Sequence, residues 1–213
     1  MSTPNGASRS GLRQRWFAWF FARSDAVLDD PRLATIKRKY LSDLHGALLE
    51  IGAGTGGNFP YFAPDVRWIG IEPNVFMHQR LRRTAEKYGF ASDIRPAQGE
   101  HLPVDDASMD AVVTSHVLCS VDDQAQVLSE VMRVLKPGGK FAFIEHVAAP
   151  ESSSLRFMQR LIEPPWRFAG DGCHLGRDTG SVIERAGFSQ VAIERFSLPY
   201  FVAAPHVAGI AVK

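Results

Sequence analysis

The sequence predicts an α/β fold, a doubly wound sheet of mostly parallel strands that ends in an antiparallel strand. Three observations lead to this prediction. A short apolar run, Leu48–Ile51, enters a glycine-rich turn at residues 52–57. A second strand pattern ends in an acid, Glu72, 20 residues after Gly52. Farther along the chain, strand-like runs alternate with helical patterns, which is the order of βαβ units.

Length and composition fit one ordinary globular domain. The chain has 213 residues, 45% of them apolar and 22% charged, with a formal net charge of +1. No clustered basic excess of the kind that nucleic-acid surfaces need is present. The two cysteines, Cys119 and Cys173, form no C-x-x-C motif. We therefore expect no disulfide framework, no metal site and a reducing, cytoplasmic compartment. The sequence indicates no oligomeric state.

The N-terminal part, residues 1–45, is predicted to be a helical cap or lid on a cofactor-binding domain at residues 46–213. Residues 1 to about 10 are rich in Ser, Gly, Pro and Asn and are expected to be disordered. A helical, aromatic pattern then runs from Leu12 to Leu28 among arginines. An interfacial membrane helix has the same composition, but aromatics at helical spacing more often pack on a domain. The apolar run is too short to span a bilayer and lacks a signal-peptide cleavage site.

The glycine-rich turn is the strongest candidate for a binding site. Gly52, Gly54 and Gly57 satisfy G-x-G-x-x-G, although such turns also occur as plain strand-to-helix corners. Glycine adopts backbone conformations closed to other residues and admits a ligand close to the main chain. Glu50 is placed to brace the turn or to meet the amino group of a bound amino acid. Glu72 is placed to accept hydrogen bonds from a ribose.

The remaining elements follow in order. A helix ending near Tyr88 and Gly89 is expected after Asn74, and a polar turn that could receive an adenine follows the next strand. Asp122 is expected to cap a helix running to Leu135. The predicted strands are 66–72, 93–97, 109–113, 140–144, 191–196 and 206–212, the helices are 31–44, 152–168 (interrupted by Pro164-Pro165) and 179–186, and the turns are 99–103, 136–139 and 171–174.

Candidate catalytic groups are histidines that could move a proton from a bound substrate. His116 and His146 follow predicted strand ends, and His174 lies in a polar turn. The alternative for each is a structural hydrogen bond. On the substrate side we place Trp166, Asp171 and Cys119, the last more as buried packing than as a nucleophile. The predicted cofactor-binding residues are Glu50, Gly52, Ala53, Gly54, Gly56, Asn58, Glu72, Pro73, Gly99, Glu100, His101 and Ser115.

These motifs resemble the class I S-adenosylmethionine-dependent methyltransferases. The resemblance rests on Glu50–Gly56, on Glu72 and on Lys136-Pro137-Gly138-Gly139, and it covers the chain from about residue 46. It implies a Rossmann-like, seven-stranded sheet in which only the strand in the last-but-one position of the sheet is antiparallel. It also implies S-adenosyl-L-methionine as cofactor, with the glycine turn and Glu72 holding two parts of it.

A more specific resemblance is to the animal methyltransferase-like alkyl thiol methyltransferases. It rests on residues 116–121, 145–148, 171–173 and 205–213. It implies a small, apolar thiol as acceptor, which suits an enzyme with a weak base because a thiol has a pKa of about 8.5. Other acceptors stay open: a phenol, a quinone precursor or a lipid amine. A nicotinamide oxidoreductase and a catalytically silent cofactor-binding module are the alternatives of another class.

Overall fold

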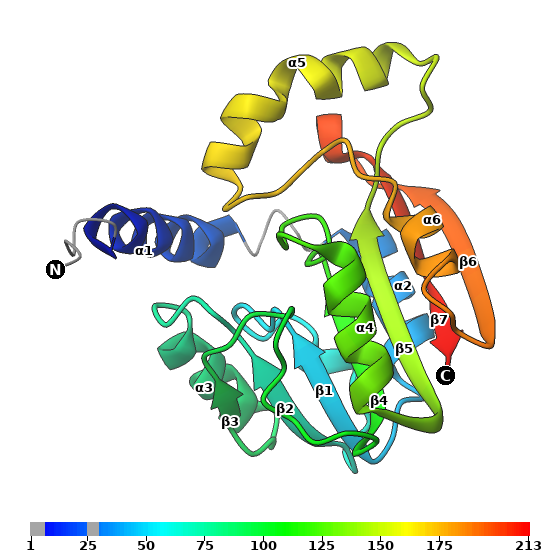
Figure 1. The fold of residues 1–213 in the computed structure, drawn as a ribbon. Coiled ribbons are helices and arrows are strands. Elements are labelled where there is room, and N and C mark those ends of the chain that lie inside the picture. Colours follow the sequence, from blue (N-terminus) through cyan, green and yellow to red (C-terminus); the bar gives the residue numbers. More distant parts are fainter. Residues whose placement is uncertain (1–6, 25–29) are drawn as a thin grey trace, which may run out of the picture.

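The computed structural model describes residues 7–24 and 30–213 and contains a seven-stranded sheet (Figure 1). Its order is β3-β2-β1-β4-β5-β7-β6, and all neighbours pair in parallel except β7, which is antiparallel to β5 and β6. The predicted fold class is confirmed. The strands are β1 (Ala47–Ile51), β2 (Arg67–Ile71), β3 (Asp93–Arg95), β4 (Met109–Ser115), β5 (Leu135–His146), β6 (Gln190–Ser197) and β7 (Pro205–Val212).

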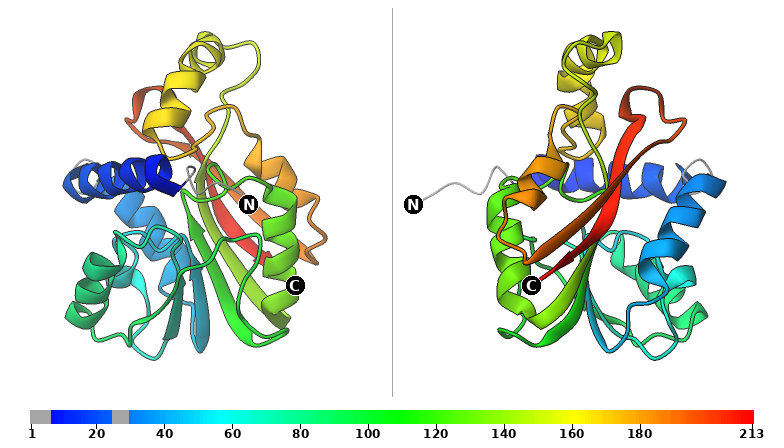
Figure 2. Two further views of the ribbon diagram at one scale, coloured as in Figure 1. Left: turned by 60° about the vertical axis from the view of Figure 1, so that its left-hand side comes forward. Right: turned by 90° about the vertical axis from the view of Figure 1, so that its right-hand side faces the viewer.

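Helices cover both faces of the sheet, which is seen edge-on at the right of Figure 2. Successive strand residues face opposite sides, so Leu49 and Val112 pack with α4 and α6, while Leu48 and Val113 pack with α3 and η1. The helices are α1 (Ala7–Ser24), α2 (Pro31–Leu41), α3 (His78–Lys87), α4 (Gln124–Val134), α5 (Ser154–Ala169) and α6 (Thr179–Glu184), with short 3₁₀ turns η1 (Phe59–Tyr61) and η2 (Phe201–Ala203).

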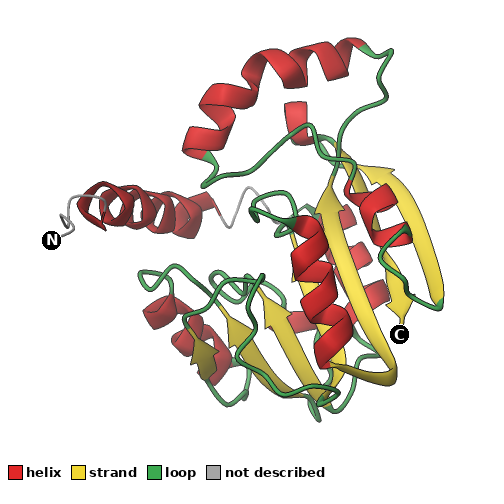
Figure 3. Ribbon diagram, viewed as in Figure 1, coloured by secondary structure: helices red, strands yellow, loops and turns green. Residues whose placement is uncertain are grey.

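Two helices lie beyond the carboxyl ends of the parallel strands. Figure 3 shows α1 and α5 past the strand tips, outside the two layers that sandwich the sheet. α5 packs with η2 around Leu175 and Val202 in a small apolar cluster of its own. α2, by contrast, packs on the sheet through Leu33 and Ile36, which contact the cluster around Ile144. The ligand-binding edge of an open α/β sheet is therefore roofed by α1 and α5.

The N-terminal helix differs from the prediction at both ends. α1 begins at Ala7, so residues 7–10, expected to be disordered, are helical. Residues 1–6 and 25–29 lie outside the described part of the chain, which leaves the predicted end of this helix at Leu28 untested. α2 begins as predicted at Pro31, where the Asp30 carboxylate accepts a hydrogen bond from the Arg32 N–H. Nothing tests the domain boundary at residue 46.

Three local predictions are corrected. α4 is capped by Asp123 rather than Asp122, since the Asp123 carboxylate accepts the Ala125 and Gln126 N–H groups. The predicted turn at 136–139 is a bulge inside β5, which begins at Leu135 because Met109 pairs with that residue. α5 continues through Pro164 and Pro165. Both prolines are exposed, so carbonyls that lose a helical donor there can bond water.

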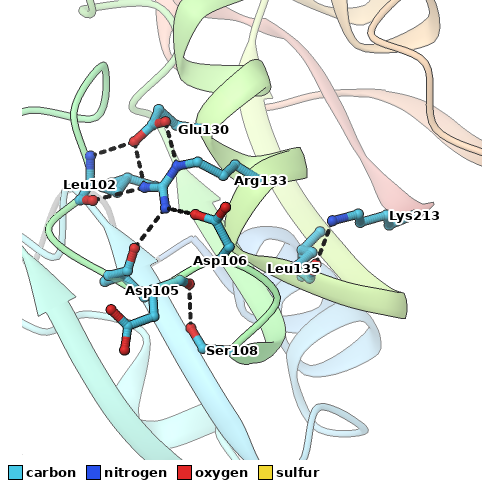
Figure 4. Close-up of polar contacts among 9 residues, drawn as sticks. Leu102, Asp105, Asp106, Ser108, Glu130, Arg133, Leu135 and Lys213 are labelled. Atoms are coloured by element: carbon cyan, nitrogen blue, oxygen red, sulfur yellow. Dashed lines mark hydrogen bonds and ion pairs between the residues drawn. The ribbon is translucent and has the colours of Figure 1, made fainter.

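The loop before β4 is held against α4 by one arginine (Figure 4). The Arg133 guanidinium donates to the Glu130 carboxylate, to Asp106 at 2.6 Å and to the Leu102 carbonyl at 2.9 Å. Glu130 in turn accepts the Leu102 N–H at 2.8 Å. A planar guanidinium with several donors suits such a multiple contact. The network fixes the chain that follows Gly99 and Glu100, two residues of the predicted cofactor site.

Candidate active site

A cavity of about 980 Å³ opens at the carboxyl ends of β1, β2, β4 and β5. The loops after these strands supply much of its wall, and residues of α1, α2, α3, α5 and β7 complete it. Most of the residues predicted from the sequence line this one cavity: Glu50, Gly52, Ala53, Gly54, Gly56, Asn58, Glu72, Pro73, Gly99, Glu100, Ser115, His116, His146, Trp166 and Asp171. Cys119, His101 and His174 do not, which corrects their assignment to the pocket.

The glycine turn has the backbone that only glycine adopts readily. Gly52, Gly54 and Gly56 have φ of +65°, +56° and +87°, whereas Gly57 has no positive φ. The Gly52 N–H donates to the Ile71 carbonyl at 2.8 Å, which ties the turn to β2. A Cβ atom on Gly52 would lie 2.5 Å from Val117 Cγ2. The positions that need glycine for their backbone conformation are therefore 52, 54 and 56, not the 52, 54 and 57 of the literal dinucleotide motif.

Glu50 braces the turn from beneath. Its carboxylate is 1% exposed and accepts hydrogen bonds from Asn58 Nδ2 at 2.7 Å and from Trp68 Nε1 at 2.8 Å. The bracing role that the sequence suggested is thus present in the fold. Asn58 also carries a buried amide oxygen, Oδ1, without a hydrogen-bond partner, and Asn58 lines the cavity. A buried acceptor that faces a binding site is suited to a donor on a bound ligand.

Glu50 makes folding stability depend on pH. Burial raises the pKa of its carboxyl to about 7, because desolvation outweighs the hydrogen bonds from Trp68 and Asn58. The folded state then holds a proton that the unfolded state releases, so stability falls as pH rises from about 4.5 to about 7 and is level above that. Across this range we expect the free energy of unfolding of wild type to fall by about 3 kcal/mol more than that of Glu50→Gln.

Urea denaturation of both proteins at four pH values between 5 and 8 measures this difference. Burial also raises the pKa of Glu145 to about 7. This residue is present in both proteins, so its contribution to the pH dependence of stability cancels in the difference between them. Glu50→Gln is expected to be less stable at pH 5, because one of the two donors then faces the Gln amide NH₂ instead of an oxygen. Parallel stability curves would show that Glu50 is ionised throughout.

Glu72 stands at the end of β2 and holds the loop beyond it. One carboxylate oxygen accepts the Gly54 N–H and the other accepts the Asn74 N–H, each at 2.8 Å. The side chain is 5% exposed, and burial raises the pKa of its carboxyl. Glu72 thus links the second strand to the glycine turn, and each oxygen has a further lone pair for a ligand. Binding of a ribose by Glu72 stays a prediction.

The turn after β3 reaches the cavity through Gly99 and Glu100. Glu100 Oε1 accepts the N–H groups of Asp122 and Asp123, at 2.8 and 3.3 Å, and so stabilises the start of α4. His101 is exposed and lies outside the cavity. Its position was predicted from adjacency alone, and in a tight turn neighbouring side chains point in different directions. Contact of Glu100 with an adenine stays a prediction.

The two histidines that follow β4 and begin β7 are in contact. His116, with φ of +59°, places its Nε2 3.0 Å from His206 Nε2, and His206 Nδ1 lies 2.9 Å from the Ala204 carbonyl oxygen. That carbonyl can only accept, so His206 Nδ1 carries the proton and His206 Nε2 accepts from His116. Desolvation lowers the pKa of both imidazoles, that of His206 to about 4, and both are neutral at pH 7. His206 was not predicted from the sequence as a site residue.

His146, the last residue of β5, meets two cysteines. His146 Nε2 lies 2.8 Å from Cys173 Sγ, and Trp166 Nε1 donates to the same sulfur at 3.2 Å. Hydrogen bonds lower the pKa of the Cys173 thiol to about 4, and the hydrogen bond from Cys119 contributes more than the one from His146. Cys119, 1% exposed, lies beside them. The sequence prediction of Cys119 as buried packing is right about its burial but missed this cluster.

The other predicted residues take separate places. His174 Nδ1 lies 3.1 Å from the Glu163 carboxylate, and this residue is not among those that line the cavity, which favours the structural alternative. Asp171 lines the cavity and forms an ion pair with Arg13 of α1 at 3.2 Å. The Asn74 side chain also reaches α1, at the Gln14 carbonyl. The N-terminal helix therefore contributes to the cavity wall, as a lid would, and its movement is untested. Phe17 of α1 also lines the cavity, and further lining residues that were missed are Lys37 and Tyr200.

Comparison with known proteins agrees with this geometry. A methyltransferase domain family matches residues 49–143. Human thiol S-methyltransferase TMT1A is 36% identical over 96% of this chain and 88% of its own length. Rat thiol S-methyltransferase TMT1B is 41% identical over 81% of this chain and 75% of its own.

Solved structures share the fold at low sequence identity. The YcgJ protein of Bacillus subtilis superimposes with a TM-score of 0.65 at 17% identity, over 85% of this chain and 97% of that one. Phosphoethanolamine N-methyltransferase 2 of Haemonchus contortus, solved with S-adenosyl-L-methionine, has a TM-score of 0.63 at 15% identity, over 85% and 51%. The matching family model and the thiol methyltransferase relatives show the family, and the sheet order and the cavity agree with it. This chain belongs to the class I S-adenosylmethionine-dependent methyltransferases, in the family of the thiol S-methyltransferases.

Proposed function

We propose that this enzyme transfers a methyl group from S-adenosyl-L-methionine to a small, apolar thiol. The observation that carries the proposal is a single cavity with two chemically different ends. One end has the glycine turn and two buried carboxylates, Glu50 and Glu72. The other end has His116 and His206, whose pKa values desolvation lowers so that both are neutral at pH 7, and Tyr200 lies beside His206. The thiol methyltransferase relatives support the choice of acceptor.

The glycine end fits the cofactor. Gly52 and Gly56 have left-handed backbones, and a Cβ atom on either would collide with Val117 or Phe59, so only glycine permits the tight turn that lines the cavity. The unpartnered Asn58 Oδ1 suits the ammonium group of the methionyl moiety, and Glu72 suits the ribose hydroxyls. The bound cofactor supplies a methyl group already activated as a sulfonium. The residues at this end bind and orient it.

The histidine end fits an acceptor that must lose a proton. His116 donates its Nε2–H to His206, so the Nδ1 atom of His116 carries no proton and has a free lone pair. No hydrogen-bond partner of this Nδ1 atom is found among the described residues. A thiol needs little help, because several per cent is thiolate near neutrality. Phe17, Trp166 and Tyr200 contribute aromatic surface to the same cavity, which suits an apolar acceptor. A positioned base of this kind typically contributes ~10²–10⁴ in rate.

The free cysteines support a reducing compartment, and we propose a cytoplasmic location for the enzyme. Within residues 7–24 and 30–213, no helix has both the length and the apolar character to cross a membrane. The predicted use of α1 as a membrane-surface contact is a weaker alternative, because Arg13, Gln14 and Phe17 of this helix line the cavity.

An acceptor panel tests the function. The enzyme is incubated with methyl-labelled S-adenosyl-L-methionine and alkyl thiols, phenols or amines of matched size. We expect label on the thiols at least tenfold faster than on the phenols and amines, because near neutrality several per cent of the thiol is the nucleophilic thiolate, whereas the phenol stays protonated and the amine is held as its ammonium. Label on a phenol or an amine alone would refute the thiol assignment. Label on nothing, with the cofactor bound in calorimetry, would indicate a silent binding module, and tenfold preference for NADH over S-adenosylhomocysteine would indicate an oxidoreductase.

A further inference from the structure

Three donor atoms from distant parts of the sequence meet in the buried wall of the cavity. Cys119 comes from the loop after β4, His146 ends β5, and Cys173 comes from the loop after α5. Their side chains are 1%, 4% and 8% exposed. One ligand atom of each lies within 4.8 Å of the others. Buried polar groups in protein interiors are hydrogen-bonded, paired or coordinated to a metal, so this cluster has to satisfy its donors and acceptors within itself or through a shared ion.

The donor set is that of a thiophilic cation. Two sulfurs and one imidazole nitrogen match the Cys₂His sites of zinc enzymes, and the group contains no carboxylate that would favour Mg²⁺ or Ca²⁺. In a tetrahedral zinc site the ligand atoms lie roughly 3.5–3.8 Å apart, which is within the size of this cluster. The contact between His146 Nε2 and Cys173 Sγ, at 2.8 Å, is a hydrogen bond. It has to open by roughly 0.7 Å when an ion replaces the shared proton.

The surroundings fit a negatively charged sulfur ligand. Trp166 Nε1 donates to Cys173 Sγ at 3.2 Å, and such outer donors commonly orient metal-bound thiolates. The fourth side of the cluster is next to the cavity. His146 itself, Ser120 beside Cys119 and Gly172 beside Cys173 all line it. Catalytic zinc sites use three protein ligands and leave the fourth position to water or substrate.

We propose that Cys119, His146 and Cys173 bind one thiophilic divalent cation, with Zn²⁺ as the expected ion, and that the acceptor thiol occupies its fourth coordination position. This assignment rests on the proposed thiol methylation and deepens it. A thiol bound to such an ion is deprotonated outright, so the acceptor reaches the methyl donor as a thiolate. Its proton leaves to solvent or to His116, and the sulfur then forms the new S–CH₃ bond while the donor's sulfonium C–S bond breaks.

Direct metal binding tests the site. Reduced, chelator-treated enzyme is titrated with Zn²⁺, and with Co²⁺ as a spectroscopic probe. We expect one ion per chain, thiolate-to-cobalt charge-transfer absorption, and a change in the cobalt d–d bands when an alkyl thiol is added. Cys119→Ser, Cys173→Ser and His146→Ala should each weaken Zn²⁺ affinity at least 100-fold. His174→Ala, next to Cys173 but outside the cavity, is the matched control and should bind as wild type.

The folded state of each variant is checked by its thermal melt and by its affinity for S-adenosylhomocysteine. Reduced wild type that takes up no Zn²⁺ and shows no cobalt–thiolate absorption would overturn the site, and so would uptake that survives the cysteine substitutions. Cobalt bands that ignore added thiol would overturn the role of the fourth position. Thiol methylation by chelator-treated, metal-free enzyme at the wild-type rate would also refute the inference, while leaving the proposed function intact.

Discussion

Gly52→Ala is expected to weaken binding of S-adenosyl-L-methionine by ~30–4,000-fold. The new Cβ would lie 2.5 Å from Val117 Cγ2, at a residue with φ of +65°. A left-handed conformation costs an alanine roughly 1–2 kcal/mol, and overpacking adds roughly 1–3 kcal/mol. The turn relieves this strain by moving, which removes the backbone position that the cofactor needs. Isothermal titration calorimetry with S-adenosylhomocysteine measures the loss.

Gly57→Ala is the matched control for that experiment. Gly57 belongs to the literal G-x-G-x-x-G motif, yet it has no positive φ and its added Cβ would meet only Lys37 Nζ, at 3.6 Å. We expect affinity within about twofold of wild type, since such contacts are ordinary. Equal losses at positions 52 and 57 would contradict the assignment of the turn to Gly52, Gly54 and Gly56.

Glu72→Ala is expected to reduce cofactor affinity by about 1.5–3 kcal/mol, which is roughly 10- to 150-fold. The substitution removes the proposed acceptor for the ribose hydroxyls. It also leaves the Gly54 and Asn74 N–H groups without the oxygens that now accept them at 2.8 Å. Because the second effect disturbs the turn even without ligand, the thermal melt of the free protein should fall as well.

Glu72→Gln separates the two effects. The amide keeps one oxygen acceptor, so one of the two backbone hydrogen bonds survives while the charge is lost. We expect an affinity between those of wild type and Glu72→Ala. Glu86→Ala, an exposed carboxylate on α3, controls for the change in net charge and should bind as wild type. An unchanged titration for Glu72→Ala would remove the ribose assignment.

The sequence was informative wherever the signal is local. Leu48–Ile51 was predicted as a buried strand because four apolar or bracing positions precede a glycine turn, and β1 has these residues. The Gly89 helix end was correct because only a residue that accepts φ of +79° closes a helix there easily. Neighbouring positions were less certain. From the sequence, Asp122 and Asp123 are equally good N-cap residues. The structure gives both a similar backbone contact, because the Glu100 carboxylate accepts the N–H groups of both.

The sequence by itself determined the fold class, the glycine turn and the two carboxylates beside it, since these depend on strand periodicity and on backbone conformations within a few residues. Only the tertiary structure decided which side chains share the acceptor end. His116 and His206 are 90 positions apart and meet because β7 inserts beside β5. Cys119, His146 and Cys173 meet because loops from separate crossovers converge at one edge of the sheet. No local pattern encodes such a meeting, because strand order is set by the packing of the whole sheet.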